Sequence, residues 1–452
     1  MAASHLTALI SLLPPCLLAL LLLRLATVLD SDPDAALPRV KAAAPFPLRF
    51  RHDGAFKILQ VADMHFGNGA ATSCRDVAPD GGGARCSDLN TTRFLRRVIE
   101  AERPDLIAFT GTALSSPLCD DLASKVATLA ELVSPRSAHL ARQHAVALPN
   151  GYPWRTSLHL MPPLFQFGTG DNIFGGSATD AAESLLRAIS PAIEYKVPWA
   201  AVLGNHDQES TMTREELMTF MSLMDYSVSQ VNPPGFLVHG FGNYHIGIHG
   251  PFGSELVNTS LLNLYFLDSG DREVVNGVKT YGWIKESQLA WLRATSVELQ
   301  KTALSPALSF FHIPIPEVRG LWYSGFKGQY QEGVACSSVN SGVLDTLVSM
   351  GDVKGVFLGH DHLNDFCGNL NGIWFCYGGG FGYHAYGRPH WPRRARVIYT
   401  ELKKGQKLWL EVESIQTWKL LDDEKLSKID EQVLWRRSQD DSDHSILSRP
   451  GA

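Results

Sequence analysis

Five short segments of this chain carry residue types that bind metal ions in hydrolytic sites. They are Asp63-x-His65, Asp171-Asn172, Gly204-Asn205-His206-Asp207, His312 and Gly359-His360-Asp361-His362. Each motif alone is weak, because a single Asp-x-His or Asn-His pair is structural in most proteins. Together they are a strong signal, because every one follows an apolar run that resembles a buried strand. Carboxylate, imidazole and amide oxygen are the ligands that hold Zn²⁺, Fe or Mn²⁺. Two such ions about 3.5–4 Å apart can activate water and clamp a transferring phosphoryl group.

The surrounding sequence predicts the elements that must position these motifs. Short apolar, β-prone runs that end in polar clusters cover residues 56–65, 105–111, 197–207, 307–316 and 353–362. Helix-like stretches lie between them, and this repetition indicates an α/β layered sheet. Ligand sites in such sheets collect at the carboxyl ends of the strands. A β-rich section (GNYHIGIHG, LLNLYFLDSG, GIWFCYGGGFGYH, ARVIYTELKK and LWLEVESIQTWKLL) predicts a second sheet stacked on the first.

The composition excludes several classes of protein. With 452 residues, 45% hydrophobic and 19% charged, the chain is not a disordered tail protein, a coiled coil or a small disulfide-stapled module. The 40 Lys and Arg against 46 Asp and Glu give a net charge of -6, so no nucleic-acid partner is expected. Residues 421–452 are charged and rich in Ser and Asp, which predicts a frayed helix followed by a disordered tail.

The amino terminus indicates targeting to the secretory pathway. Residues 8–23 are apolar but are interrupted by Pro14-Pro15, which fits a signal peptide within residues 1–30 better than a spanning helix. An uncleaved amino-terminal anchor, which would be the chain's one membrane contact, and a cytoplasmic location are the alternatives. Two glycosylation sequons, at Asn90 and Asn258, suit an extracellular or vacuolar glycoprotein.

The cysteines suggest two disulfides. Cys74 and Cys86 bracket a Gly-rich loop, and Cys367 and Cys376 flank a predicted hairpin. Both pairs are plausible disulfides in an oxidising compartment. The remaining cysteines are Cys16 in the apolar stretch and Cys119 and Cys336, which have no obvious mates. The alternative is six buried thiols.

The motif set resembles the calcineurin-like metallophosphoesterase superfamily, which carries D-x-H, G-D-x, G-N-H-D/E, H and G-H-x-H blocks in that order. VADMHFG, DNIFGG, GNHDQES, HIPIPE and YGGGFGYHAYGR further resemble the plant purple acid phosphatase-like branch often labelled probable inactive. A fungal dual-specificity phosphatase group shares this arrangement. The resemblance covers residues 45–420 apart from one segment. It implies a four-layer αββα sandwich with a dimetal site at the carboxyl ends of the strands.

The resemblance also implies a role for each matching residue. The first metal would be held by Asp63, His65, Asp171 and His362. Asp171 would bridge to the second metal, completed by Asn205, His312 and His360. Metal-bound hydroxide would attack phosphorus in line.

The implied catalytic residues lie beside the ligands. His206, oriented by Asp207, would stabilise the phosphoryl oxygens or protonate the leaving group. His384, near Tyr383 and Arg388, lies in a region that shapes substrate access in relatives, so it is a candidate substrate contact. His249 could lie near the site but is better explained as a strand histidine.

One position departs from the true purple acid phosphatases. Those enzymes carry a tyrosinate three residues after the bridging Asp, which gives the ferric colour, and Phe174 stands there in this chain. His65 restores a ligand, as in ordinary metallophosphoesterases. The sequence therefore predicts two metal ions of the Fe, Zn or Mn type with a full ligand count and no purple absorption band. The label "inactive" rests on the missing Tyr, and the ligand count argues against taking it literally.

A segment of 59 residues, 112–170, separates the second predicted strand from Asp171. Deleting it gives PDLIAFTG-DNIFGG, a continuous sequence typical of the superfamily. Our hypothesis is a retained intron or a gene-model error, and a lineage-specific loop is the alternative. In either case Asp171 must reach both metals from the far end of the segment.

The function that these motifs predict is dimetal-dependent hydrolysis of phosphoric esters. The leading prediction is a phosphomonoesterase, either an acid phosphatase or a phosphoprotein phosphatase. The alternatives are a phosphodiesterase that uses the same site, or a non-enzymatic glycoprotein impaired by the segment 112–170.

Overall fold

The computed structural model describes residues 41–78, 86–111, 178–209, 211–406 and 408–438. Ala43–Ala452 forms one compact unit, to which the elements below belong. Asp171, Asn172, Phe174, the segment 112–170, the predicted signal peptide, Cys16 and Cys119 lie outside the described residues.

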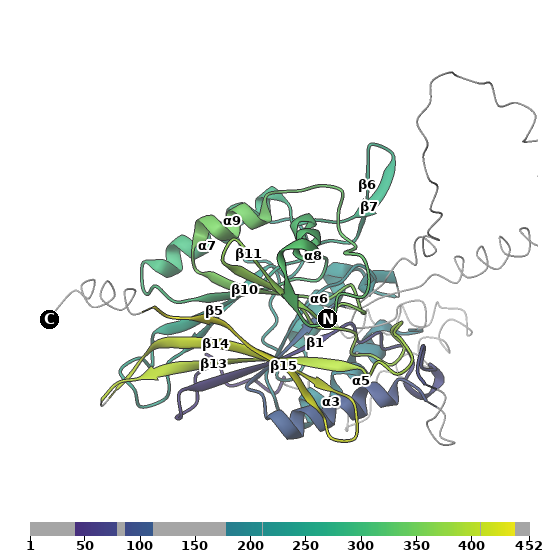
Figure 1. Cartoon of the computed structure of the whole chain (residues 1–452), viewed down its shortest axis with the longest axis horizontal. Helices are drawn as coiled ribbons and strands as arrows, with labels where there is room; N and C mark the ends of the chain where they lie inside the picture. Colours follow the sequence, from purple (N-terminus) through teal and green to yellow (C-terminus); the bar gives the residue numbers. More distant parts are fainter. Residues whose placement is uncertain (1–40, 79–85, 112–177, 210, 407, 439–452) are drawn as a thin grey trace, which may run out of the picture. The chain divides into compact units, whose positions relative to one another are not determined.

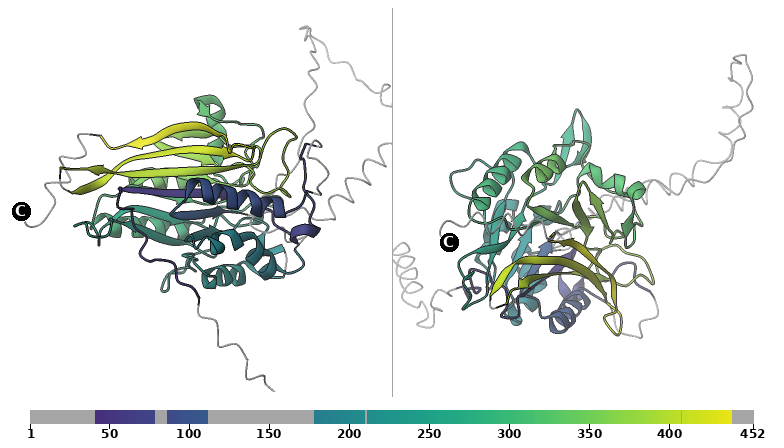
Figure 2. Two further views of the ribbon diagram at one scale, coloured as in Figure 1. Left: turned by 90° about the horizontal axis from the view of Figure 1, so that it is seen from below. Right: turned by 60° about the vertical axis from the view of Figure 1, so that its left-hand side comes forward.

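A six-stranded sheet has the order β15-β14-β13-β1-β2-β3. Its parallel part consists of β1 (Ala55–Ala62), β2 (Leu106–Thr110) and β3 (Trp199–Val202). Its antiparallel part consists of β13 (Arg394–Lys404), β14 (Trp409–Leu421) and β15 (Lys428–Arg436). These three long strands run side by side in yellow in Figure 2.

A seven-stranded sheet has the order β4-β5-β8-β10-β12-β11-β9. Its central, mutually parallel strands are β5 (Ser260–Phe266), β8 (Ala307–Phe310), β10 (Val353–Leu358) and β12 (Ile373–Tyr377). The outer strands are β4 (Tyr244–His249), β11 (Cys367–Leu370) and β9 (Phe326–Lys327). A separate hairpin is made by β6 (Arg272–Val275) and β7 (Val278–Tyr281).

Helices cover the outer faces of the two sheets. In Figure 1, α3 (Leu89–Glu102) and α5 (Ala181–Glu194) lie below the six-stranded sheet, and α7 (Glu286–Gln300) and α9 (Val343–Met350) lie above the seven-stranded one. The remaining helices are α6 (Arg214–Leu223), the short α8 (Leu321–Ser324), and the 3₁₀ turns η1 (Gly69–Ala71), η3 (Asp207–Glu209) and η4 (Pro316–Gly320). The expected four-layer αββα sandwich is therefore confirmed.

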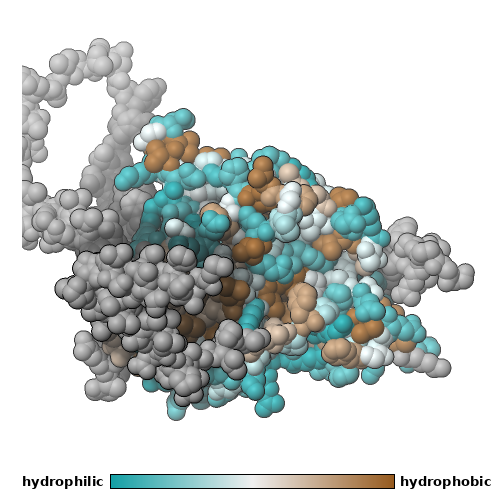
Figure 3. All heavy atoms as spheres, turned by 180° about the vertical axis from the view of Figure 1, so that it is seen from behind, coloured by the Kyte–Doolittle hydropathy of each residue, from teal (hydrophilic) through white to brown (hydrophobic). Residues whose placement is uncertain are grey.

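The main hydrophobic core joins the two sheets. It contains residues of both, and Phe266, Phe310 and Phe357 stack on neighbouring strands at centroid distances of 5.0 and 5.3 Å. On the face seen in Figure 3, hydrophobic side chains lie in small groups among hydrophilic ones. Burial of the apolar side chains in the core is the main force that holds the layers together.

The five predicted strands all form, but they divide between the two sheets. The runs at 56–65, 105–111 and 197–207 give β1, β2 and β3, whereas 307–316 and 353–362 give β8 and β10. The sequence had suggested that β13 and β14 belong to the second sheet, but both lie in the six-stranded sheet. β13 pairs antiparallel with β1, with Ile58 opposite Ile398, and β14 follows it.

The structure also differs from the expectation of a disordered tail from residue 421. Lys428–Arg436 forms β15 on the edge of the six-stranded sheet. Asp430 pairs with Lys419 at 2.7 Å, and the ammonium of Lys428 lies 4.0 Å from the centroid of the Trp418 ring. Charged residues alternate with Ile429, Val433 and Trp435 here, and a charged edge strand suits a position beside solvent.

Both predicted disulfides form, between Cys74 and Cys86 and between Cys367 and Cys376, while Cys336 is a buried free thiol. The second disulfide joins residues directly opposite each other on β11 and β12. Asn258 lies in an exposed turn, whereas Asn90 is half-buried in the first turn of α3. None of the helices in the described part of the chain is long and apolar enough to cross a membrane.

Candidate metal centre

Four strands deliver the predicted ligands to one place. Asp63 and His65 follow β1, Asn205 follows β3, His312 follows β8, and the pair His360 and His362 follows β10. Two of these strands belong to each sheet, so the ligands meet where the carboxyl ends of both sheets come together. All six side chains are completely buried.

The first group consists of Asp63, His65 and His362. One ligand atom from each residue lies within 4.8 Å of the other two. Nε2 of His65 is 2.9 Å from Nε2 of His362, which in turn is 3.7 Å from Oδ1 of Asp63. Two imidazole nitrogens and a carboxylate at this spacing are a suitable donor set for a transition-metal ion.

The second group consists of Asn205, His312 and His360. Nε2 of His312 lies 3.1 Å from Oδ1 of Asn205 and 3.2 Å from Nδ1 of His360. Asp63 connects the two groups, because its Oδ1 accepts the backbone N–H of His360 at 3.0 Å and lies 4.0 Å from Nδ1 of His312. The structure thus brings together six of the seven predicted ligands, and the seventh, Asp171, lies outside the described residues.

Two buried atoms show that these residues fit a metal ion. Among the residues that the structure describes, Oδ2 of Asp63 and Nε2 of His360 have no hydrogen-bond partner. A buried acceptor without a partner costs free energy, and a carboxylate costs more than a neutral group. A bound cation would satisfy such atoms.

Burial determines the electrostatics of the cluster. It raises the pKa of Asp63 well above its ordinary value. It also lowers the pKa of His65, His360 and His362, and the charges of neighbouring histidines add to the effect. The three imidazoles are therefore neutral at physiological pH, and a neutral imidazole is the form that binds metal.

The backbone around the cluster is strained and tightly packed. Asp63, His65 and His360 have φ values of 57°, 50° and 79°, in the left-handed region that side chains other than glycine disfavour. Gly111, which ends β2, approaches His312 so closely that a Cβ atom would lie 1.8 Å from its Nδ1. Only glycine allows this contact.

A hydrogen bond to a main-chain carbonyl fixes the orientation of His362. Its Nδ1 lies 3.1 Å from the carbonyl oxygen of Tyr386, and the two rings stack at a centroid distance of 3.8 Å. The hydroxyl of Tyr386 donates to Glu332 at 2.9 Å. A proton on Nδ1 leaves Nε2 as the lone-pair donor toward Asp63 and His65.

The predicted proton donor His206 is buried, and a carboxylate contacts it. Nδ1 of His206 lies 2.6 Å from Oε1 of Glu209, one turn of η3 away. Asp207, which the sequence had suggested as the orienting residue, accepts the backbone N–H of Gly204 at 2.7 Å. The His-x-x-Glu spacing was the sequence signal for Glu209, because residues three apart are neighbours on a helical turn.

The β6–β7 hairpin supplies two residues that sequence analysis missed. Arg272 contacts the imidazole of His206, and Tyr281 packs edge-on against the ring of His360 at a centroid distance of 4.5 Å. Neither residue belongs to a motif, so the sequence gives no signal for them.

The other two histidines of interest lie outside the cluster. Nδ1 of His384 is 2.6 Å from the carbonyl oxygen of Ser73, so this ring contacts the disulfide-bonded loop. His249 is the last residue of β4, and its backbone pairs with Leu48 and Phe50.

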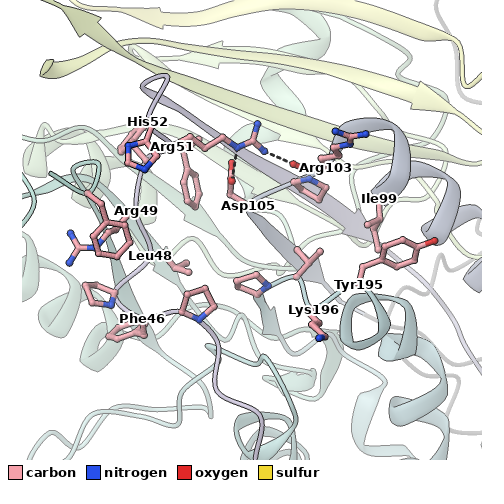
Figure 4. A pocket seen from close by; sticks show the side chains of 18 of the residues that line it. Phe46, Leu48, Arg49, Arg51, His52, Ile99, Arg103, Asp105, Tyr195 and Lys196 are labelled. Atoms are coloured by element: carbon pink, nitrogen blue, oxygen red, sulfur yellow. Dashed lines mark hydrogen bonds and ion pairs between the residues drawn. The ribbon is translucent and has the colours of Figure 1, made fainter. Parts of the chain in front are cut away.

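A pocket of about 870 Å³ lies at the opposite ends of the strands. Its lining includes Phe46, Leu48, Arg51, Asp105 and Tyr195, which precede or flank β1, β2 and β3 (Figure 4). Arg51 and Asp105 form an ion pair at 2.7 Å inside it. No histidine cluster faces this pocket among the described residues, so we place the chemistry at the carboxyl ends.

The chain matches known proteins over most of its length. The sequence profile of the calcineurin-like phosphoesterase family matches residues 161–364. Probable inactive purple acid phosphatase 28 of Arabidopsis thaliana is 56% identical over 412 residues, covering 88% of this chain and 89% of that protein. Probable inactive purple acid phosphatase 29 of the same plant is 46% identical over 404 residues, covering 86% and 88%.

A crystal structure of a dimetal phosphatase from Danio rerio matches with a TM-score of 0.44 and 12% identity, covering 84% of this chain and 99% of that one. From its relatives, the chain belongs to the calcineurin-like phosphoesterase family. Its relatives include plant proteins named probable inactive purple acid phosphatases, which confirms the resemblance seen in the motifs.

Proposed function

We propose that this protein is a dimetal-dependent phosphoric ester hydrolase and that phosphomonoesters are its substrates. The observation that carries the proposal is the pairing of two ligand groups through Asp63. Asp63, His65 and His362 would hold one ion, and Asn205, His312 and His360 would hold the second. Asp171 is proposed as the bridging ligand from the part of the chain outside the described residues.

The residues around the metals have separate tasks in this proposal. Two bound ions lower the pKa of water toward neutrality and offset the charge of the phosphate. His206 stands beside the second group through its neighbour Asn205, and its contact with Glu209 holds the ring in one orientation. From there it can stabilise a phosphoryl oxygen or deliver a proton to the leaving group. His384 is proposed as a contact for the rest of the substrate.

The test is hydrolysis of p-nitrophenyl phosphate by the whole chain between pH 4 and 8, with Zn²⁺, Fe or Mn²⁺ added. The same assay with bis(p-nitrophenyl) phosphate asks whether the protein prefers diesters. A His206→Ala variant, prepared identically, exposes any contaminating phosphatase. Turnover that depends on metal and is lost in the variant supports the proposal.

Metal binding without hydrolysis of either ester would contradict the proposal and favour a non-enzymatic glycoprotein. Removing residues 112–170 and repeating the assay would then show whether that segment misplaces Asp171.

A peptide from 112–170 in the mass spectrum of the native protein would defeat the hypothesis of a retained intron. Visible spectra of the metal-loaded protein test the prediction, made from Phe174, that the protein has no purple absorption band.

We further propose that the protein enters the secretory pathway and is glycosylated at Asn258. The two disulfides support this location, because such bonds persist in oxidising compartments. Asn258 is exposed in a turn, which suits a glycan better than the half-buried Asn90. Glycosidase treatment followed by mass spectrometry tests both sites.

A further inference from the structure

The β6–β7 hairpin stands apart from both sheets and reaches the metal centre with its base. Its turn is Asn276-Gly277, with φ values of 51° and 78°, as a two-residue hairpin turn requires. In Figures 1 and 2 it projects from the layered body. Arg272 and Tyr281 are directly opposite each other at its base.

Successive side chains of a strand point to opposite faces, so the two faces of this hairpin can be distinguished. One face anchors the hairpin to the body. Glu273 pairs with Lys285 at 3.0 Å, and the hydroxyl of Thr280 accepts the backbone N–H of Ser338 at 2.7 Å. Arg272 and Tyr281 lie on the other face, which is turned toward the metal centre.

On that face the two residues contact a histidine from each side of the site. Nη2 of Arg272 is 2.6 Å from Nε2 of His206, and the ring of Tyr281 packs edge-on against His360. Nη1 of Arg272 pairs with Glu209, which also contacts Nδ1 of His206. The guanidinium therefore lies beside the proposed proton donor, and Tyr281 on the same face lies beside His360, a proposed ligand.

A merely structural role explains this placement poorly. The hairpin is already anchored by its opposite face, so it does not need Arg272 to hold it. The side chain of Arg272 is 46% exposed, so it contacts both solvent and the edge of the buried cluster. Like charges repel at short range, so a permanent cation beside a cation-binding cluster is favourable only when anionic groups lie between them. Glu209 is one such group, but burial raises its pKa to about 7, and a phosphate would supply more negative charge.

We infer that Arg272 binds the phosphate of the substrate and makes the site prefer phosphomonoesters to phosphodiesters. This inference rests on the hydrolase activity proposed above. A guanidinium offers a planar fork of N–H donors that fits two phosphate oxygens at once. A monoester has three non-bridging oxygens and up to two negative charges, whereas a diester has two and one. The same cation therefore stabilises the monoester, and the charge that develops on it in the reaction, more strongly.

The experiment compares Arg272→Gln with wild type in the full chain, loaded with the metal that gives turnover. We expect kcat/KM for p-nitrophenyl phosphate to fall roughly 100-fold or more and that for bis(p-nitrophenyl) phosphate to fall less than about tenfold. Inhibition by inorganic phosphate should weaken in parallel. Arg272→Lys should recover part of the loss, because it keeps the charge and loses the fork.

Arg96→Gln is the matched control. Arg96 is 37% exposed and forms a forked ion pair with Glu194 on the helical face, so its removal should leave both substrates and phosphate inhibition unchanged. Thermal unfolding of each variant verifies that the chain is folded.

Equal losses on both esters with unchanged phosphate inhibition would overturn the inference and reduce Arg272 to a positioning residue for His206. If wild type hydrolyses neither ester, the proposed function fails, yet the inference can still be tested. Calorimetric titration of inorganic phosphate into the metal-loaded protein should then show binding that Arg272→Gln weakens at least tenfold. Equal binding by both proteins would refute the role of Arg272.

Discussion

The two ends of the strands β1, β2 and β3 differ in almost every physical respect. At the carboxyl ends the proposed ligands are completely buried, the backbone of Asp63 and His65 is strained, and Oδ2 of Asp63 lacks a partner among the described residues. At the amino ends a pocket of about 870 Å³ remains open. There the carboxylate of Asp105 is satisfied on both oxygens, by Arg51 at 2.7 Å and by the N–H of Lys57 at 2.8 Å.

In this protein, therefore, the volume of a pocket does not indicate where the catalytic site lies. Strain and unsatisfied buried atoms persist only where the surrounding structure holds them in place, and they gather at functional sites. The carboxyl ends have both features. In the amino-end pocket the charged groups Arg51 and Asp105 already neutralise each other.

Loss of a proposed ligand should give the largest contrast between the two ends. His360→Ala removes a buried imidazole from the second group, and we expect roughly a 1,000-fold fall in kcat/KM together with loss of bound metal. The matched control is His249→Ala, since His249 pairs through its backbone with residues of the amino-end pocket. Activity and metal content are measured together. Equal effects of the two substitutions would break the comparison.

A buried ion network lies near the carboxyl ends of the strands, and we expect its loss to lower mainly the free energy of unfolding. Asp365 is fully buried and accepts from Arg394 at 2.5 Å and from Lys419 at 2.6 Å. Asp365→Asn leaves the buried guanidinium of Arg394 without its carboxylate and leaves Lys419 with Asp430 alone, which should lower the free energy of unfolding by about 3–5 kcal/mol. Urea denaturation at pH 7 measures it.

The pH dependence of that effect has a defined sign. Burial alone would raise the pKa of Asp365, but the charges of Lys419 and Arg394 outweigh it and lower the pKa below its ordinary value. A depressed pKa stabilises the fold above the unfolded pKa, and this stabilisation is lost as the pH falls through the folded one. Wild type and Asp365→Asn should therefore converge in stability below roughly pH 4. A constant difference down to pH 2 would exclude this charge network as the cause.

Within the carboxyl ends, two carboxylates compete for the role of orienting His206. Glu209→Gln keeps the shape of the side chain and removes its charge, so we expect kcat to fall roughly tenfold with little change in stability. Asp207→Asn is the comparison, because Asp207 accepts the N–H of Gly204. If Asp207→Asn lowers kcat and Glu209→Gln does not, the orienting residue is the one that the sequence suggested.

The smallest effect is expected at the amino ends. Arg51→Ala breaks an ion pair whose partners are 34% and 20% exposed, and such pairs contribute at most about 1 kcal/mol. Activity should stay within about twofold of wild type, because this pair lies at the amino ends of the strands and the proposed ligands lie at the carboxyl ends. A loss of activity beyond tenfold would show that the pocket serves the reaction.

Sequence analysis predicted the elements well, because their signals are local. The helix-like stretches at residues 90–104 and 285–300 predicted α3 and α7, and the apolar runs before Asp63, Asn205, His312 and His360 predicted the strands. The assignment of strands to sheets was less accurate. β13 was expected in the second sheet and pairs with β1, since pairing depends on contacts between residues far apart in the chain.

By itself, the sequence determined the ligand types and their positions at strand ends. It also indicated the two disulfides, because paired cysteines around short loops have few alternatives. The resemblance already implied two groups of proposed ligands, and only the tertiary structure showed that Asp63 lies between them. It alone decided that Arg272 meets His206 across 66 residues of chain. A contact of that kind is set by how a hairpin packs on the body, and no periodicity or motif in the sequence records it.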